Sequence, residues 1–502
     1  MTRVQWQVRN ASPNDAQAAA EAADAALDGG LEADAIPLLE AALRAHPRDA
    51  RLWQLLALAH RGLEDLAPAV EAMRRAAELA PRDALIAHGL ARTTLEAGLP
   101  ATALFDRALA LSPLDASIIL GRAAAQYAGG RLGAAIEDLD AQLHRHPGWV
   151  EGHATLARLR WMAGERDGFA RSFEAALSLA PAETAIWKGL LDTLAQAEMY
   201  GAGLAVVARG RALAGPDPLF DAYEAVCASE SGMIEAADRL FARLGPPRDI
   251  AMAVRRVRHL LRAGRPEQAL ALAEPLAPQA GGELWPYVSL GWRLTGDPRR
   301  EWLEGDPRFV GVYDIAERLP PLDALARCLR GLHLASEQPL EQSVRGGTQT
   351  DGPLFARIEP EIRALRRAVV EAVEAHVAGL PPPIPGHPLL GGPRGPVRFS
   401  GSWSVRLTGG GRHANHLHPA GWLSSALYVA LPGETERGSA PAGWLTLGEP
   451  QESLGLGLAA FRTIEPKPGR LVLLPSTMWH GTVPFGEGER LTVAFDVAPT
   501  AP

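Results

Sequence analysis

The sequence predicts a multi-domain chain, with an all-α solenoid of helical repeats followed by a β-rich barrel or jelly roll. Two observations predict this fold class. Pro47, Pro81, Pro113, Pro147 and Pro181 are separated by 34, 32, 34 and 34 residues, and each follows an alanine-rich apolar run. The C-terminal part instead contains at least five short runs of β-branched, aromatic or alternating apolar residues, which suit the strands of a barrel or jelly roll.

The N-terminal repeats share a pattern of small and large residues as well as a period. Small residues let two helices approach closely, and a large residue fills the gap between neighbouring pairs. Counted back from each proline, the packing positions are Ala35, Leu39 and Ala42; Ala69, Met73 and Ala76; Ala101, Phe105 and Ala108; Ala135 and Leu139; Phe173 and Ala176. Period and pattern together resemble the tetratricopeptide repeat family over about residues 15 to 190.

The periodicity decays after residue 190, but helical segments such as MIEAADRLFARL and PEQALALAEPLA persist to about residue 300. We interpret them as degenerate repeats that close the solenoid. The next segment carries Trp292, Trp302, Phe309 and Tyr313, an aromatic density typical of a seam between domains. The predicted domains are tetratricopeptide repeats over residues 1–190, degenerate helical repeats over 191–300, and a β-rich domain with flanking helices over 301–502.

Three histidines of the β-rich domain have the spacing of a metal site. His416 and His418 are two residues apart in HANHLHPAGWLSSALYV, so both rings lie on one face if this segment is extended. His480 follows the apolar run LVLLP, which predicts a buried strand ending in a turn, and it can project into the same cavity. Imidazole suits iron, copper, nickel and zinc, and three ligands leave positions open for substrate and oxygen.

These histidines, with Arg490, resemble the 2-oxoglutarate/Fe(II)-dependent oxygenases, whose fold is a double-stranded β-helix. In that family a His-x-Asp/Glu pair and a distal His hold iron. A basic residue about ten positions later binds the far carboxylate of 2-oxoglutarate, and Arg490 stands ten residues after His480. The HxHP motif, WLSSALYV, RLTVAFD and the upstream LEQSVRGGTQT look like a bacterial branch of oxygenases often fused to tetratricopeptide repeats.

One position departs from the general family pattern. His418 stands where most members have a carboxylate ligand. The resemblance therefore implies a metal held by three neutral imidazoles, or by two imidazoles and water if His418 turns away. The nearest acids in the sequence, Glu434 and Glu436, lie beyond the strand that carries Tyr428.

Further residues are candidates for contact with the co-substrate or substrate. Tyr428, twelve residues after His416, is expected either to donate its hydroxyl to the co-substrate carboxylate beside Arg490 or to be a core tyrosine. Arg345 lies in QSVRGGTQT, where paired glycines permit either close approach to a ligand or a structural turn. His413 has the opposite parity from His416, so we expect it in a loop facing substrate or solvent.

Composition excludes several classes of function. The net charge of −8 and the pI near 6.0 argue against nucleic acid as a partner, because no Lys/Arg block dominates. The first residues lack an apolar signal core, and no run of ~18 uncharged apolar residues appears. We therefore expect a cytoplasmic protein without a membrane partner.

The resemblance implies an enzyme, a dioxygenase with Fe(II) as cofactor and 2-oxoglutarate as co-substrate. Because a repeat solenoid presents an extended concave surface, the expected reaction is hydroxylation of a protein or peptide side chain presented by the repeats. Three alternatives stay open. They are a small-molecule oxygenase whose repeats serve assembly, a non-catalytic scaffold with a degenerate β-helix domain, and a cupin-like three-histidine iron enzyme in which Arg490 is only structural.

Overall fold

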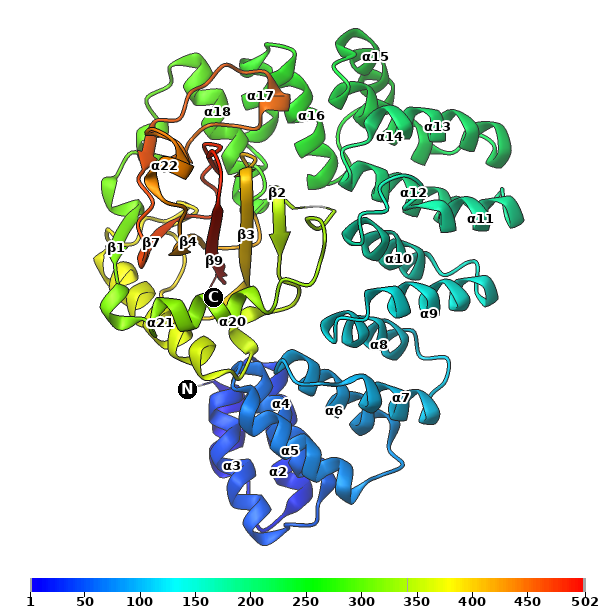
Figure 1. Cartoon of the computed structure of the whole chain (residues 1–502), viewed down its shortest axis with the longest axis vertical. Coiled ribbons are helices and arrows are strands. Elements are labelled where there is room, and N and C mark those ends of the chain that lie inside the picture. The colour runs from blue at the N-terminus through cyan, green and yellow to red at the C-terminus, as the bar shows by residue number, and fades with distance from the viewer. Residues whose placement is uncertain (1, 341, 500–502) are drawn as a thin grey trace. The chain divides into compact units, whose positions relative to one another are not determined.

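The computed structural model describes residues 2–340 and 342–499 (Figure 1). Helices fill the first part of the chain, and two antiparallel sheets follow, in agreement with the predicted fold class. The chain forms two compact units, one of residues 1–141 with 351–363 and one of residues 142–350 with 364–502. This division differs from the predicted domain boundaries at 190 and 300, which stay predictions. Among the described helices, none has both the length and the apolar character that a membrane crossing needs.

The first unit is built from short antiparallel helices. They are α1 (Arg3–Asn10), α2 (Ala16–Asp28), α3 (Glu32–Ala45), α4 (Ala50–Gly62), α5 (Leu66–Leu79), α6 (Ala84–Glu96), α7 (Thr102–Leu111), α8 (Ala116–Ala128) and the first part of α9 (Leu132–Arg145). Three of the periodic prolines lie two residues before a capping aspartate. The side chains of Asp49, Asp83 and Asp115 each accept two backbone N–H groups from the first turn of α4, α6 and α8.

The predicted packing positions of the repeats are buried, which confirms the small and large pattern. Leu39, Met73, Phe105, Leu139 and Phe173 are at most 1% exposed. The alanines that flank them are at most 2% exposed; they are Ala35, Ala42, Ala69, Ala76, Ala101, Ala108, Ala135 and Ala176. Burial of this apolar face supplies most of the stability of such short helices, because a helix of 10 to 14 residues is marginal alone.

A segment from later in the chain completes the first unit. The backbone N–H of Ile358 donates to the carbonyl of Ala97 at 3.2 Å. Ala356 joins a small apolar core with Leu66, Ala69 and Ala97. Residues 351–363 therefore belong to this unit although they follow it by more than 200 positions.

The second unit begins with further helical pairs. They are α10 (Val150–Met162), α11 (Arg171–Leu179), α12 (Thr184–Gln196), α13 (Tyr200–Ala214), α14 (Pro218–Glu230), α15 (Ile234–Leu244), α16 (Ile250–Arg262), α17 (Pro266–Ala273), α18 (Trp285–Thr295) and α19 (Arg300–Glu304). Beyond them lie α20 (Leu322–Arg330), which packs against strand β4, the long helix α21 (Pro360–Gly379) and the short α22 (Glu434–Arg437).

Two antiparallel sheets form the β-rich part of this unit. The larger sheet has the order β1-β7-β4-β9-β3-β2 and the smaller the order β6-β5-β8. The strands are β1 (Gly311–Asp314), β2 (Val344–Gln349), β3 (Phe399–His413), β4 (Leu423–Ala430), β5 (Leu445–Leu447), β6 (Arg462–Ile464), β7 (Arg470–Pro475), β8 (His480–Thr482) and β9 (Glu489–Val497). Strands β3, β4, β5, β7 and β9 overlap the C-terminal runs of β-branched, aromatic or alternating apolar residues that the sequence predicts as strands.

The last helices share a core with the β-rich part. Tyr287 of α18 meets Trp479 edge to face, with ring centroids 5.7 Å apart. Trp479 Nε1 donates to the carbonyl of Pro286 at 3.3 Å. Trp292 and Leu454 are buried in the same apolar cluster. The aromatic seam predicted around Trp292 is therefore a continuous core between helices and sheets.

Candidate metal centre and co-substrate pocket

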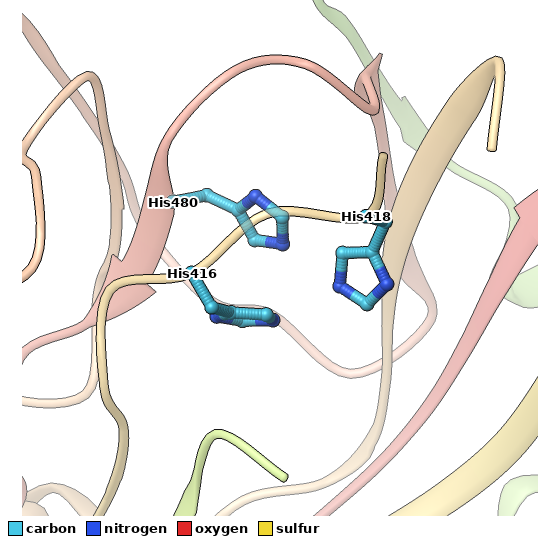
Figure 2. Close-up of side chains that lie close together, drawn as sticks. All are labelled: His416, His418 and His480. Carbon is cyan, nitrogen blue, oxygen red and sulfur yellow. The ribbon is translucent and has the colours of Figure 1, made fainter. Parts of the chain in front are cut away.

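The three histidines converge although two of them lie outside the named strands. His416 forms an antiparallel bridge with His480, the first residue of β8. The N–H of His416 donates to the His480 carbonyl at 2.9 Å, and the reverse bond measures 3.2 Å. Figure 2 shows the rings of His416, His418 and His480 turned toward one another. One ring nitrogen from each lies within 4.8 Å of the others, a grouping that a small movement of the rings would close around a metal ion.

The partners of the ring nitrogens fix which nitrogen faces the centre. Nδ1 of His416 is 2.8 Å from the carbonyl of Ala414, and Nδ1 of His480 is 2.9 Å from the carbonyl of Met478. Nδ1 of His418 is 2.9 Å from Oδ2 of Asp496. Because carbonyl and carboxylate oxygens only accept, each Nδ1 carries a proton, which leaves Nε2 as the nitrogen that can face a metal. Three imidazoles oriented in this way present Nε2 toward one centre.

Burial also favours the neutral, metal-binding form. It lowers the pKa of His480 to about 4, with a further contribution from the neighbouring His418. Burial holds the pKa of His416 well below its ordinary value, and the nearby His480 and His418 rings add to the effect. At neutral pH the Nε2 atoms of His416 and His480 therefore do not have to lose protons before a metal binds.

Arg490 lies in the wall of the same cavity as the three histidines. It is 2% exposed, and its Nη1 donates to the carbonyl of Gly443 at 3.0 Å. Its guanidinium stacks 5.0 Å from the ring centre of Tyr428. Arg490 Nε and the Tyr428 hydroxyl are buried without a hydrogen-bond partner. Tyr428 is not among the residues that line the inner cavity. A buried donor without a partner is costly unless an acceptor binds it.

Arg345 does not line this inner cavity, but it lines a larger pocket beside it that His416 and His418 also border. Its Nη1 donates to the carbonyls of Gln342 and Val344, and its Nη2 pairs with Glu198 at 3.3 Å. The paired glycines beside it have a structural explanation. Gly346 has a φ of +74° at an irregularity in the β2–β3 ladder, and a Cβ at Gly347 would lie 2.2 Å from the carbonyl of Arg406.

Near the histidines, sequence reasoning misplaced His413 and did not single out Asp496. His413 ends strand β3 and lines the inner cavity instead of lying in a loop. Trp403 stacks on His418 at 5.6 Å with an interplanar angle of 16°. Asp496 contacts His418 from strand β9. Asp496 could have been found from the alternation of strand β9, in which every second residue faces the same side. Arg490, Thr492 and Ala494 line the cavity, and Asp496 is the next residue on that side.

The inner cavity adjoins larger pockets. It holds about 40 Å³ and shares Gln342, Ser343, His416 and His418 with an outer pocket of about 330 Å³. A groove of about 1180 Å³ is lined by His413 and Asn415, and by Glu198 from the turn between α12 and α13. A five-carbon diacid therefore needs side chains of the inner cavity to move, while the groove has ample room.

Comparison with known proteins agrees with this site. Residues 401–496, which include all three histidines, Arg490 and Tyr428, match the model of a family described as "Putative 2OG-Fe(II) oxygenase". The chain thus joins helical repeats of the tetratricopeptide pattern to a domain that matches this putative 2OG-Fe(II) oxygenase family over residues 401–496. Among curated proteins, none matches the chain.

Several solved structures are similar to part of the chain. MamA from Desulfovibrio magneticus RS-1 is 18% identical over 34% of this chain and 96% of its own, with a TM-score of 0.30. A tetratricopeptide repeat protein from Parabacteroides merdae is 19% identical over 46% and 91%, with a TM-score of 0.31. A Pseudomonas putida prolyl-4-hydroxylase is 18% identical over 38% and 94%, with a TM-score of 0.26. At such low scores no functional conclusion rests on these likenesses.

The oxygenase domain has groups that fit both components its family name implies. Three neutral Nε2 donors suit a first-row divalent ion such as Fe(II). The unpaired Arg490 Nε and Tyr428 hydroxyl suit a carboxylate, which accepts several hydrogen bonds at once. The resemblance to the family, carried by residue order and spacing, predicted the grouping of His416, His418, His480 and Arg490.

Proposed function

We propose that the chain is an iron- and 2-oxoglutarate-dependent oxygenase that hydroxylates a side chain of a protein or peptide. The observation that carries the proposal is the presence of His416, His418, His480 and Arg490 in the wall of one cavity. Bound Fe(II) and 2-oxoglutarate would activate O2, with one oxygen atom entering a C–H bond of the substrate and the other converting 2-oxoglutarate to succinate and CO2. The protein supplies geometry, charge pairing and exclusion of water.

Each residue has a distinct task in this proposal. His416, His418 and His480 hold the metal through Nε2 and leave its remaining positions open. Arg490 pairs with the far carboxylate of 2-oxoglutarate, and Tyr428 donates its hydroxyl to the same group. Both donors are unpaired and buried before the co-substrate binds. Trp403 covers His418 and helps to keep water away from it.

The groove supports a protein or peptide as the substrate. Its volume of about 1180 Å³ exceeds the range of roughly 300–1,000 Å³ that is usual for small-molecule sites. Its lining carries charges of both signs, including Glu198, Arg412 and Glu449, beside His413. Such a lining suits a polar peptide segment better than a small apolar metabolite.

The direct test is an anaerobic titration. The protein is loaded with Fe(II), 2-oxoglutarate is added without oxygen, and the visible charge-transfer band of the iron–2-oxoglutarate chelate is followed. We expect a saturable band. Iron binding without such a band would reject the 2-oxoglutarate reaction, and no iron binding would reject the metal centre itself. Oxygen is then admitted with candidate peptides, and mass spectrometry measures the gain of one oxygen atom.

One observation favours a second candidate function, a three-histidine iron enzyme that does not use 2-oxoglutarate. Arg490 already donates to Gly443 and stacks on Tyr428, contacts that a purely structural arginine would also make. The unpaired Nε and hydroxyl favour the first proposal. The same titration separates the two, because only the first requires the charge-transfer band.

A further inference from the structure

Asp496 holds His418 in a way that distinguishes it from the other candidate ligands. The Nδ1–H groups of His416 and His480 donate to backbone carbonyls. That of His418 donates to a carboxylate, with Nδ1 and Oδ2 of Asp496 2.9 Å apart. Among the three histidines, His418 alone therefore has a charged acceptor.

The carboxylate of Asp496 is itself fixed in place. Asp496 is 8% exposed, and the hydroxyl of Ser424 on β4 donates to its Oδ1. Strands β4 and β9 pair with Ser424 opposite Asp496. On the other side, Trp403 stacks on the His418 ring. The position of the imidazole is therefore set from two directions before any metal binds.

We propose that Asp496 is a positioning residue that replaces, through His418, the negative charge of the carboxylate ligand expected at position 418. The inference rests on the metal centre of the proposed function. A carboxylate that accepts the Nδ1 proton orients the ring, makes Nε2 a better donor and partly offsets the charge of a bound cation. A centre of three neutral imidazoles thereby regains an anion one hydrogen bond away from the metal.

The first arm of the test removes the charge and keeps the shape. Asp496→Asn retains an oxygen that can accept from Nδ1 of His418. We expect Asp496→Asn to bind Mn(II) and Co(II) about 10- to 100-fold more weakly than the wild-type chain, measured by anaerobic calorimetry. The Co(II) visible spectrum should also shift, because the donor strength of His418 falls. Unchanged affinity in Asp496→Asn overturns the proposal.

The control is Glu489→Gln on the same strand. Glu489 is another acid of β9 and forms ion pairs with Arg330 and Arg406. Alternation along the strand places it on the opposite face from Asp496. Its variant should bind both metals as the wild type does. A loss equal to that of Asp496→Asn would mean that any lost ion pair of β9 weakens the centre, and this too overturns the proposal.

A second arm separates charge from structural support. In His418→Asp the anionic ligand is restored at position 418 itself, so adding Asp496→Asn should change metal affinity by no more than about 2-fold. An equal loss in both backgrounds, or loss of all metal binding in His418→Asp, rejects the proposal. If the wild-type chain binds neither metal, the proposed metal centre fails instead, which keeps the two failures distinct.

Discussion

At the scale of single residues, His480 is held by both its backbone and its side chain. Its backbone pairs with His416, and its Nδ1 donates to Met478. The backbone pairing does not need the imidazole, so an alanine at this position should keep the strand β8. His480 is therefore a clean position at which to remove one ligand.

We expect His480→Ala to lose bound iron while its helical circular dichroism stays that of the wild type. A first-row metal held by two imidazoles exchanges much more readily than one held by three. Iron content after anaerobic loading and desalting measures the effect. The exposed imidazole of His144 provides the comparison, since His144→Ala should retain iron. Full iron content in His480→Ala would show that the three histidines do not form the site.

We expect Arg490→Ala to weaken 2-oxoglutarate binding by roughly 2–5 kcal/mol, because a buried carboxylate loses its charged partner. Iron should remain bound. The concentration dependence of the charge-transfer band gives the affinity. Arg345→Ala is the informative comparison, since Arg345 pairs with Glu198 away from the inner cavity. A variant Arg490→Ala that consumes 2-oxoglutarate normally at low concentration would assign Arg490 a structural role.

At the scale of elements, three of the five large residues of the repeats face a glycine on the next helix. Met73, Phe105 and Phe173 lie against glycines sixteen residues later, at positions 89, 121 and 189. A Cβ on Gly121 would lie 2.3 Å from the ring of Phe105. The glycines therefore complete the small and large pattern that the repeats use to pack.

We expect Gly121→Ala to destabilise the α7–α8 pair. Alanine in a helix gains about 0.5–1 kcal/mol over glycine, but overpacking a tight contact costs typically 1–3 kcal/mol, so the cost outweighs the gain. Gly201, whose Cβ would meet nothing within 4 Å, gives the control, and Gly201→Ala should be neutral or slightly stabilising. Hydrogen exchange of the amides of α7, α8 and α13 measures both; increased protection of α7 in Gly121→Ala would contradict the packing argument.

A buried ion pair joins two helices of the second unit to the loop after β5. Glu230 of α14 accepts from Arg258 Nε at 2.8 Å and from Arg262 Nη2 at 2.6 Å. Arg258 also donates to the side chain of Gln451, and Arg262 to the carbonyl of Ser453. Burial alone would raise the pKa of the Glu230 carboxyl, but the arginines outweigh it and hold the pKa at about 2.

Glu230→Gln should cost about 3–5 kcal/mol at neutral pH, because two buried guanidinium groups lose their counter-charge. The folded-state pKa is depressed, so the stabilisation is fully present above the ordinary value of 4.5 and is lost as pH falls through about 2. The difference in hydrogen exchange of α14 and α16 between wild type and variant should therefore shrink as pH falls from 4.5 towards 2. A difference that is independent of pH would show that the charge of Glu230 is not its cause.

At the scale of the whole molecule, the oxygenase domain does not end where the helical segments end. The sequence predicts that the β-rich domain of residues 301–502 carries the metal site and that the helical repeats before it present the substrate. Tyr287 and Trp292 on α18 are buried in one core with Trp479, the residue before His480. Removal of α18 would expose several large apolar side chains, each at a cost of roughly 1.5–3 kcal/mol.

We therefore expect a fragment of residues 301–502 to bind hydrophobic dyes and to unfold less cooperatively than a fragment of residues 142–502. Iron affinity should fall in the shorter fragment. Trp479 loses its packing partner Tyr287 there, and His480, the next residue, is then held less firmly in its position. Dye fluorescence, thermal unfolding and iron content provide the comparison. A shorter fragment with native-like unfolding and full iron binding would show that the last helices are dispensable for the centre.

The sequence by itself determined the features that depend on local pattern. A period of 32 to 34 residues, with small and large apolar positions, requires helical pairs that bury one face. Alternation and β-branched runs predicted the strands, and the order and spacing of His416, His418, His480 and Arg490 predicted which residues meet. The repeat and strand signals are readable because each lies within one or two elements, whereas the grouping of the four site residues was readable through the family resemblance.

Only the tertiary structure decided which distant groups face each other. Strand β9 places Asp496 against His418. Arg345 of β2 instead pairs with Glu198, which lies in the turn between α12 and α13. His413 lines the cavity because strand β3 extends to that residue. Trp479 anchors helix α18, and residues 351–363 join the first unit. Such contacts join residues far apart in the chain, and local propensity carries no information about which pairing buries the most apolar surface and satisfies the most polar groups.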